Sequence, residues 1–140
     1  MHVGMDVYAP DVYSIDGYNW PVPTGEAGYF RDTYRRDSLA NWLAANIDPG
    51  ARGQVGLAIF SEPPCTLNSP EWREELLLKA RQWNTAAEKL AGKSSFIGTP
   101  GHDLQVVDEA GTRAYIEWTG RLLRFAEVVY ATGSPVKVDA

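Results

Sequence analysis

Glu62 is the side chain whose surroundings most clearly suggest chemistry. It follows the apolar run 55–60, in the sequence Phe60-Ser61-Glu62. If that run is a parallel strand, Glu62 lies at the carboxyl edge of the sheet, where α/β folds usually bind their ligands. A carboxylate in that position could act as a general base or as a nucleophile. The alternative is that Glu62 is a polar residue that begins a loop.

The first 25 residues are rich in aromatic side chains and contain a repeat of an aspartate followed two residues later by a tyrosine. The repeat recurs every five residues, a period that neither a helix nor a strand has, so we predict an extended, turn-rich segment. Aromatic rings there could stack on sugars or become buried in a partner protein, because they offer a large contact area with few rotatable bonds. They could instead pack over the protein's own sheet. The predicted binding residues are Tyr8, Tyr13, Asp16, Tyr18 and Trp20.

Other possible reactive groups do not form a recognisable motif. Asp6, Asp11 and Asp16 could converge on a cation, but their spacing does not match the calcium-binding loop, and we predict no metal site. His102 is followed by Asp103, although neighbours in sequence do not make a catalytic dyad. The sequence has no glycine-rich phosphate loop and no zinc-binding cluster, so we predict no cofactor.

Two stretches resemble the late barrel strands of retaining glycoside hydrolases of the mannanase type. They are 12–20, with the sequence VYSIDGYNW, and 56–62, with the sequence GLAIFSE. The resemblance implies that Glu62 is the nucleophile and that Tyr18 and Trp20 shape a sugar site. Such enzymes need a second carboxylic acid about 5 Å from the nucleophile, and a whole barrel takes about 250 residues. A chain of 140 residues has no room for the strands that would supply that acid.

Composition places the chain among ordinary globular proteins. Its 140 residues suit a single domain, 1–140, in which 1–25 form the extended aromatic-rich segment. The net charge of −5 produces no positive field that would attract nucleic acid. No apolar run is long enough to cross a bilayer, so we predict no membrane contact. A single cysteine, Cys65, cannot form an internal disulfide, which makes a cytoplasmic location the simplest expectation.

Six secondary-structure elements are predicted from apolar periodicity and from helix start and stop signals. The second helix has the clearest start, because Ser69 can cap it and Pro70 suits its first position. The third helix has the clearest amphipathic pattern, through Tyr115, Trp118 and Leu122. The predicted elements are a strand at 3–8, a helix at 26–47, a strand at 55–60, a helix at 69–92, a strand at 104–107 and a helix at 112–131.

This order predicts an α/β fold, with a small sheet and three helices in strand-helix alternation. An α+β fold with a small mixed sheet is the alternative. For function, we predict a binding or assembly protein that docks through its aromatic N-terminal segment onto a protein partner or a second copy of the chain. The alternative is a carbohydrate-active hydrolase, or a fragment of one, that uses Glu62 as its nucleophile.

Overall fold

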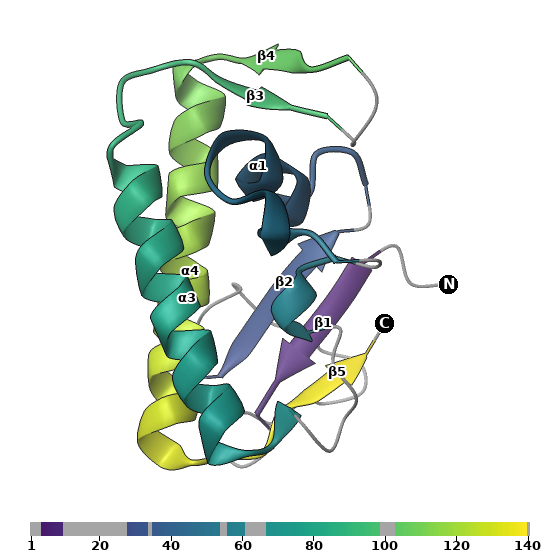
Figure 1. The fold of residues 1–140 in the computed structure, drawn as a ribbon, viewed down its shortest axis with the longest axis vertical. Helices are drawn as coiled ribbons and strands as arrows, with labels where there is room; N and C mark the ends of the chain where they lie inside the picture. The colour runs from purple at the N-terminus through teal and green to yellow at the C-terminus, as the bar shows by residue number, and fades with distance from the viewer. Residues whose placement is uncertain are drawn as a thin grey trace.

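A computed structural model describes residues 4–9, 28–33, 35–53, 56–60, 67–98 and 103–139. Two long helices, α3 (Pro70–Glu88) and α4 (Glu109–Thr132), run side by side along the long axis of the molecule (Figure 1). A three-stranded sheet lies beside them, and the short helix α1 (Leu39–Asn46) sits between this sheet and a two-stranded hairpin. The predicted combination of a small sheet with three helices is therefore confirmed for the described residues.

The three-stranded sheet is antiparallel throughout. Its central strand is β1 (Gly4–Tyr8), flanked by β2 (Tyr29–Thr33) and β5 (Lys137–Asp139). In the register, Asp6 lies opposite Arg31 on β2 and opposite Asp139 on β5. The predicted strand at 3–8 is confirmed over the residues described, but the expected parallel arrangement is wrong. Antiparallel strands, unlike parallel ones, need no crossover helix between them.

The two predicted long helices are confirmed, but α3 ends at Glu88, short of the predicted 92, and α4 begins at Glu109, before the predicted 112. Ser69 caps α3 by accepting a hydrogen bond from the backbone N–H of Trp72, with Pro70 in the first turn. Asp108 caps α4 in the same way, through the N–H of Gly111. Gly133 ends α4 in the left-handed conformation (φ 64°), which glycine adopts without a steric penalty.

The hairpin of β3 (Ser95–Ile97) and β4 (Gln105–Val107) crosses the end of the helix pair (Figure 1). The prediction of a strand at 104–107 is thus confirmed, although this strand pairs with β3 rather than joining the main sheet. Trp42 of α1 fixes the hairpin, because its indole N–H donates to the hydroxyl of Ser95 over 2.9 Å.

One apolar core joins the sheet to the helices. Phe30 of β2 lies within 6.3 Å, centroid to centroid, of Phe60 and of Phe125 on α4. Leu122, Phe125 and Val129 of α4 are fully buried, as the periodicity predicts. Tyr115 and Trp118 are only partly buried, because they flank the contact instead of facing its centre.

The predicted helix at 26–47 is only half right. Its second half is α1, which begins after Ser38 and ends before Asp48-Pro49-Gly50. Its first half contains β2 instead. Residues 29–33 alternate between the two faces of the sheet, and Tyr29, Phe30 and Thr33 belong to residue types that favour strands.

The strand predicted at 55–60 is also wrong. Residues 58–60 form a turn of 3₁₀ helix, and Gly56 just before it has a φ of 70°. Ile59 and Phe60 are nevertheless buried, and the indole N–H of Trp72 donates to the carbonyl of Ile59 over 2.9 Å. An apolar run can therefore be buried by a compact turn as well as by a strand, so apolarity alone does not decide its conformation.

Candidate binding face of the three-stranded sheet

The sheet has one face toward the core and one away from it. Met5 and Val7 of β1 belong to the core, so Asp6 and Tyr8, which alternate with them, lie on the opposite face. We call this the outer face. Directly opposed residues in an antiparallel pair share a face, so the outer face also carries the cross-strand partners Tyr29, Arg31, Lys137 and Asp139.

Asp6 is the centre of a polar cluster on the outer face. Its side chain is fully buried, and its Oδ1 accepts hydrogen bonds from the Tyr29 hydroxyl and from the Arg31 guanidinium, the latter over 2.7 Å. The other oxygen, Oδ2, is buried and finds no hydrogen-bond partner in the part of the chain that the structure describes. A buried carboxylate is tolerated when it is paired in this way, because the pairing offsets the loss of hydration.

The cluster holds its donors in fixed positions. Burial, reinforced by the hydrogen bond to Asp6, raises the pKa of the Tyr29 hydroxyl, so this phenol stays protonated and acts as a donor. Arg31 is oriented by Asp6, and 35% of its side chain remains accessible to solvent. Because Asp6 itself is covered, the groups that the outer face offers to a partner are Tyr8, which is partly buried, Arg31 and Lys137.

Residues 10–27, which include most of the predicted aromatic-rich segment 1–25, are attached to the chain beside this cluster, and we call them the aromatic segment 10–27. Tyr8 and Tyr29 are the last register pair of β1 and β2, and the N–H of Ala9 donates to the carbonyl of Gly28 over 2.9 Å. Residues 10–27 therefore connect two neighbouring strands of one sheet. Of the predicted binding residues, Tyr8 lies on β1, whereas Tyr13, Asp16, Tyr18 and Trp20 lie outside the described residues.

Glu62, the predicted nucleophile, also lies outside the described residues, as do Cys65 and His102. The residues on either side of its segment line a pocket of about 480 Å³. Trp72 and Trp83 are among its lining residues although both are buried, and Glu71 and Glu75 bring carboxylates to it. Lys79 also lines the pocket, which therefore carries charges of both signs. Its lining residues are Gly50, Ala58, Ile59, Ser69, Glu71, Trp72, Glu75, Lys79 and Trp83.

Two charged residues have roles that the sequence reasoning missed. Arg31 lies in the segment predicted as a helix at 26–47, but it is on β2 and pairs with Asp6 across the sheet. Asp32 is fully buried, and its carboxylate accepts from the backbone N–H groups of Thr33, Leu39 and Ala40 at 2.8 to 3.2 Å. The strand-favouring residue types Tyr29, Phe30 and Thr33 are the signal that could have identified β2.

Burial also changes the acidity of Asp32. Desolvation raises the pKa of its carboxyl from 3.8 to about 6, although the three backbone donors act in the opposite direction. Asp37, which precedes the cap of α1, adds a smaller repulsion that raises the pKa further. Asp32 therefore supports the start of α1 and titrates closer to neutral pH than an exposed aspartate does.

Comparisons with known proteins add no assignment, since no protein family, curated protein or solved structure matches the chain significantly. Within the described ranges, no group of three or more histidine, cysteine, aspartate or glutamate side chains is arranged to hold a metal ion. Among the helices described, none is long and apolar enough to cross a membrane.

Proposed function

We propose that this protein is a binding or assembly protein that docks onto a protein partner through the aromatic segment 10–27. The observation that carries the proposal is the attachment of the segment. Both of its ends are held by the hydrogen-bonded pair Ala9 and Gly28, at the end of the paired strands β1 and β2. Loops anchored in this way on a scaffold are where binding residues concentrate.

The composition of the segment supports the same proposal. Tyr13, Tyr18 and Trp20 lie within it, and Asp16 supplies a carboxylate among them. Tyrosine and tryptophan contribute large contact areas at little cost in conformational entropy, which is why they are enriched at interface hot spots. Tyr8 and the accessible part of Arg31 extend this surface onto the sheet.

Replacement of the segment should abolish docking and leave the fold intact. In the test variant, residues 10–27 are exchanged for Asn-Gly, because this dipeptide favours the two-residue turn that joins paired antiparallel strands. A photoreactive phenylalanine analogue replaces Trp20 in the full chain, which is irradiated in an extract of its source cells. We expect a crosslinked adduct that an excess of wild-type chain suppresses and that an excess of the shortened variant does not.

The matched control carries the same analogue in place of Phe96, which is exposed on the hairpin far along the chain from the segment. It should give no adduct that wild-type chain suppresses. Equal suppression by the wild-type and shortened chains would refute docking through residues 10–27. The mass of the adduct distinguishes a different protein from a second copy of this chain.

A second candidate function is carbohydrate hydrolysis with Glu62 as nucleophile. The observation that favours it is the pocket lined by Ala58 and Ile59, which come shortly before Glu62 in the chain, and by Ser69, which follows it. Glu71 and Glu75, which are exposed, line the same pocket and are candidates for the second acid.

A single substitution tests the nucleophile. Glu62→Gln removes the charge while keeping the shape of the side chain, so it should abolish the release of reducing ends from a mannan oligosaccharide without lowering the melting temperature. Glu74→Gln is the control, because Glu74 is exposed on α3 and does not line the pocket. Hydrolysis that survives in the Glu62→Gln variant would rule out this role.

A further inference from the structure

One face of α3 is exposed along its whole length and carries its charges in two separate groups. Its residues recur every three or four positions, so they project to one side of the helix, opposite the buried Trp72, Leu76 and Trp83. We call this the α3 outer face. It consists of Glu71, Glu74, Glu75, Leu78, Arg81, Gln82, Thr85 and Lys89, all of them exposed.

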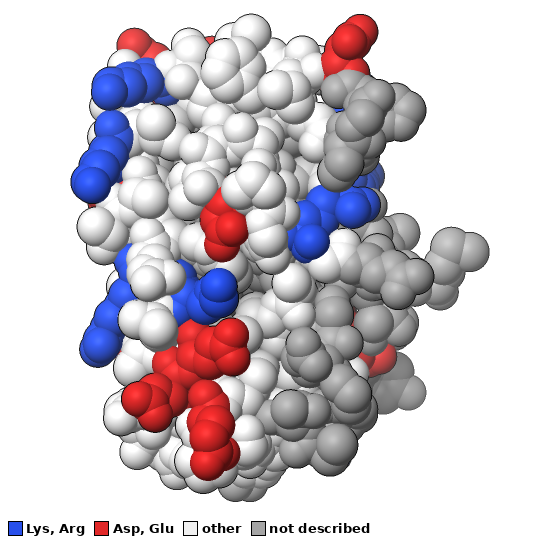
Figure 2. All heavy atoms as spheres, in the orientation of Figure 1, with Lys and Arg blue, Asp and Glu red and all other residues white. Residues whose placement is uncertain are grey.

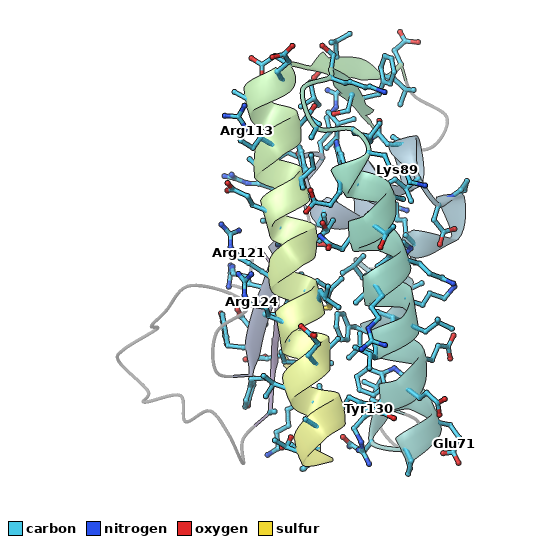
Figure 3. All side chains as sticks on the ribbon, turned by 90° about the vertical axis from the view of Figure 1, so that its left-hand side faces the viewer. Glu71, Lys89, Arg113, Arg121, Arg124 and Tyr130 are labelled. Carbon is cyan, nitrogen blue, oxygen red and sulfur yellow. The ribbon has the colours of Figure 1, made fainter. Side chains whose placement is uncertain are left out.

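Within the α3 outer face, Glu71, Glu74 and Glu75 occupy the N-terminal half and Arg81 and Lys89 the C-terminal half, while the exposed Glu88 lies at the margin of the face beside Arg81. Figure 2 shows the acidic side chains gathered over the lower end of α3, with basic side chains above them. Figure 3 places Glu71 and Lys89 at opposite ends of the helix. An acid near the start stabilises the helix dipole, which accounts for Glu71 but not for the basic residues, because the last turn of α3 contains no basic residue.

The helix dipole does not explain why the apolar side chain of Leu78 is exposed. Its side chain is 55% exposed, and it is the only large hydrophobic residue that is exposed on α3, all of whose residues the structure describes. It lies midway between the acidic and basic halves. Tyr130 of α4, which is 51% exposed, lies at the same end of the helix pair as Glu71 (Figure 3) and extends the accessible surface there.

This arrangement is self-complementary. Positions 71, 74 and 75 are as far before Leu78 as positions 85, 82 and 81 are after it. If two copies of α3 pack antiparallel about a twofold axis at Leu78, the acidic half of each helix faces the basic half of the other. Positions 74 and 81 are seven residues apart, so they lie on the same side of the face, and the twofold axis preserves that side. Arg81 of each copy then lies beside Glu74 of its partner, and the two Leu78 side chains meet at the axis.

From this symmetry we infer that the α3 outer face is a homodimer interface, with a second copy of this chain as its partner. A helix of 19 residues is about 28 Å long, so one pair of helices buries a small area. Interfaces at the lower end of the size range are typically weak, and we expect a Kd in or above the micromolar range. The interface involves none of the residues 10–27 and does not depend on the proposed function.

The test is sedimentation equilibrium of the full chain over a wide concentration range. Wild-type protein should dimerise, and Leu78→Asp should raise the Kd at least about tenfold, because it places two carboxylates at the axis. High salt should also weaken the dimer, since the Debye length falls to about 3 Å at 1 M and the rim charges are then screened.

A charge exchange makes the test specific for the pairing of Glu74 with Arg81. Glu74→Arg and Arg81→Glu each create like-charge contacts, so each variant alone should dimerise at least about tenfold more weakly. An equimolar mixture of the two restores opposite charges at both contacts and should recover the wild-type Kd. Glu109→Arg, at an exposed site in the first turn of α4, is the control and should leave the Kd unchanged.

Three results would overturn the inference. The first is a wild-type chain that stays monomeric at every concentration, and the second is a mixture of charge variants that associates no better than either variant alone. The third is a loss of dimer on Val106→Asp but not on Leu78→Asp, which would place the interface on the exposed face of the hairpin. The variant in which Asn-Gly replaces residues 10–27 should dimerise normally, so the two proposals can fail independently.

Discussion

A chain that lacks residues 1–20 should lose its cooperative fold. The deletion removes all of β1, which is the central strand of the three-stranded sheet. It strips Met5 and Val7 from the core and leaves β2 and β5 without the strand to which both are hydrogen-bonded. Exposed strand edges then favour aggregation. We expect no cooperative thermal transition by circular dichroism, and light scattering that increases with concentration.

The variant with Asn-Gly in place of residues 10–27 is the matched control for this deletion. It loses the whole aromatic segment 10–27 but keeps β1, and it should melt cooperatively. A cooperative transition in the 1–20 deletion would show that β1 is dispensable, contrary to its central position. The comparison separates the contribution of the strand to stability from that of the aromatic residues to binding.

Replacement of Asp32 by alanine should cost about 3 kcal/mol of unfolding free energy at pH 7. Asp32→Ala leaves the backbone N–H groups of Thr33, Leu39 and Ala40 without their acceptor. Relief of the buried charge offsets only part of this loss. Urea unfolding measures the difference, and Asp103→Ala, at an exposed site, should change the free energy by less than about 0.5 kcal/mol. A comparably small loss for Asp32→Ala would contradict its role at the start of α1.

The pH dependence of stability offers a second measurement on Asp32. The pKa of the Asp32 carboxyl is about 6 in the folded protein, compared with the ordinary value of 3.8. At a pH between these two values, the folded state therefore holds a proton that the unfolded state has released. The contribution of Asp32 to the free energy of unfolding therefore falls as the pH rises through this window, by about 3 kcal/mol in total. Asp32→Asn cannot titrate, and the wild-type minus variant difference should decline from about pH 4 to pH 6. A difference that rises with pH would mean that the backbone donors outweigh desolvation.

The site was only partly predictable from the sequence. The aromatic residues from Tyr8 to Trp20 and their unusual period are visible in the sequence, and so is Glu62 after an apolar run. The pairing of Asp6 with Arg31 is not visible, because it depends on the register between β1 and β2. The connection of the aromatic segment to two neighbouring strands follows only from that same pairing.

The sequence by itself determined the two long helices. The cap at Ser69, the stop at Gly133 and the apolar stripe of α4 act over a few residues, so local physics suffices to place the helices to within a few residues, although the cap at Asp108 was not predicted. Only the tertiary structure decided the direction of the strands, the compact turn at 58–60 and the partners of the buried aspartates. These features depend on contacts between segments far apart in the chain, and local sequence patterns are compatible with more than one such set of contacts.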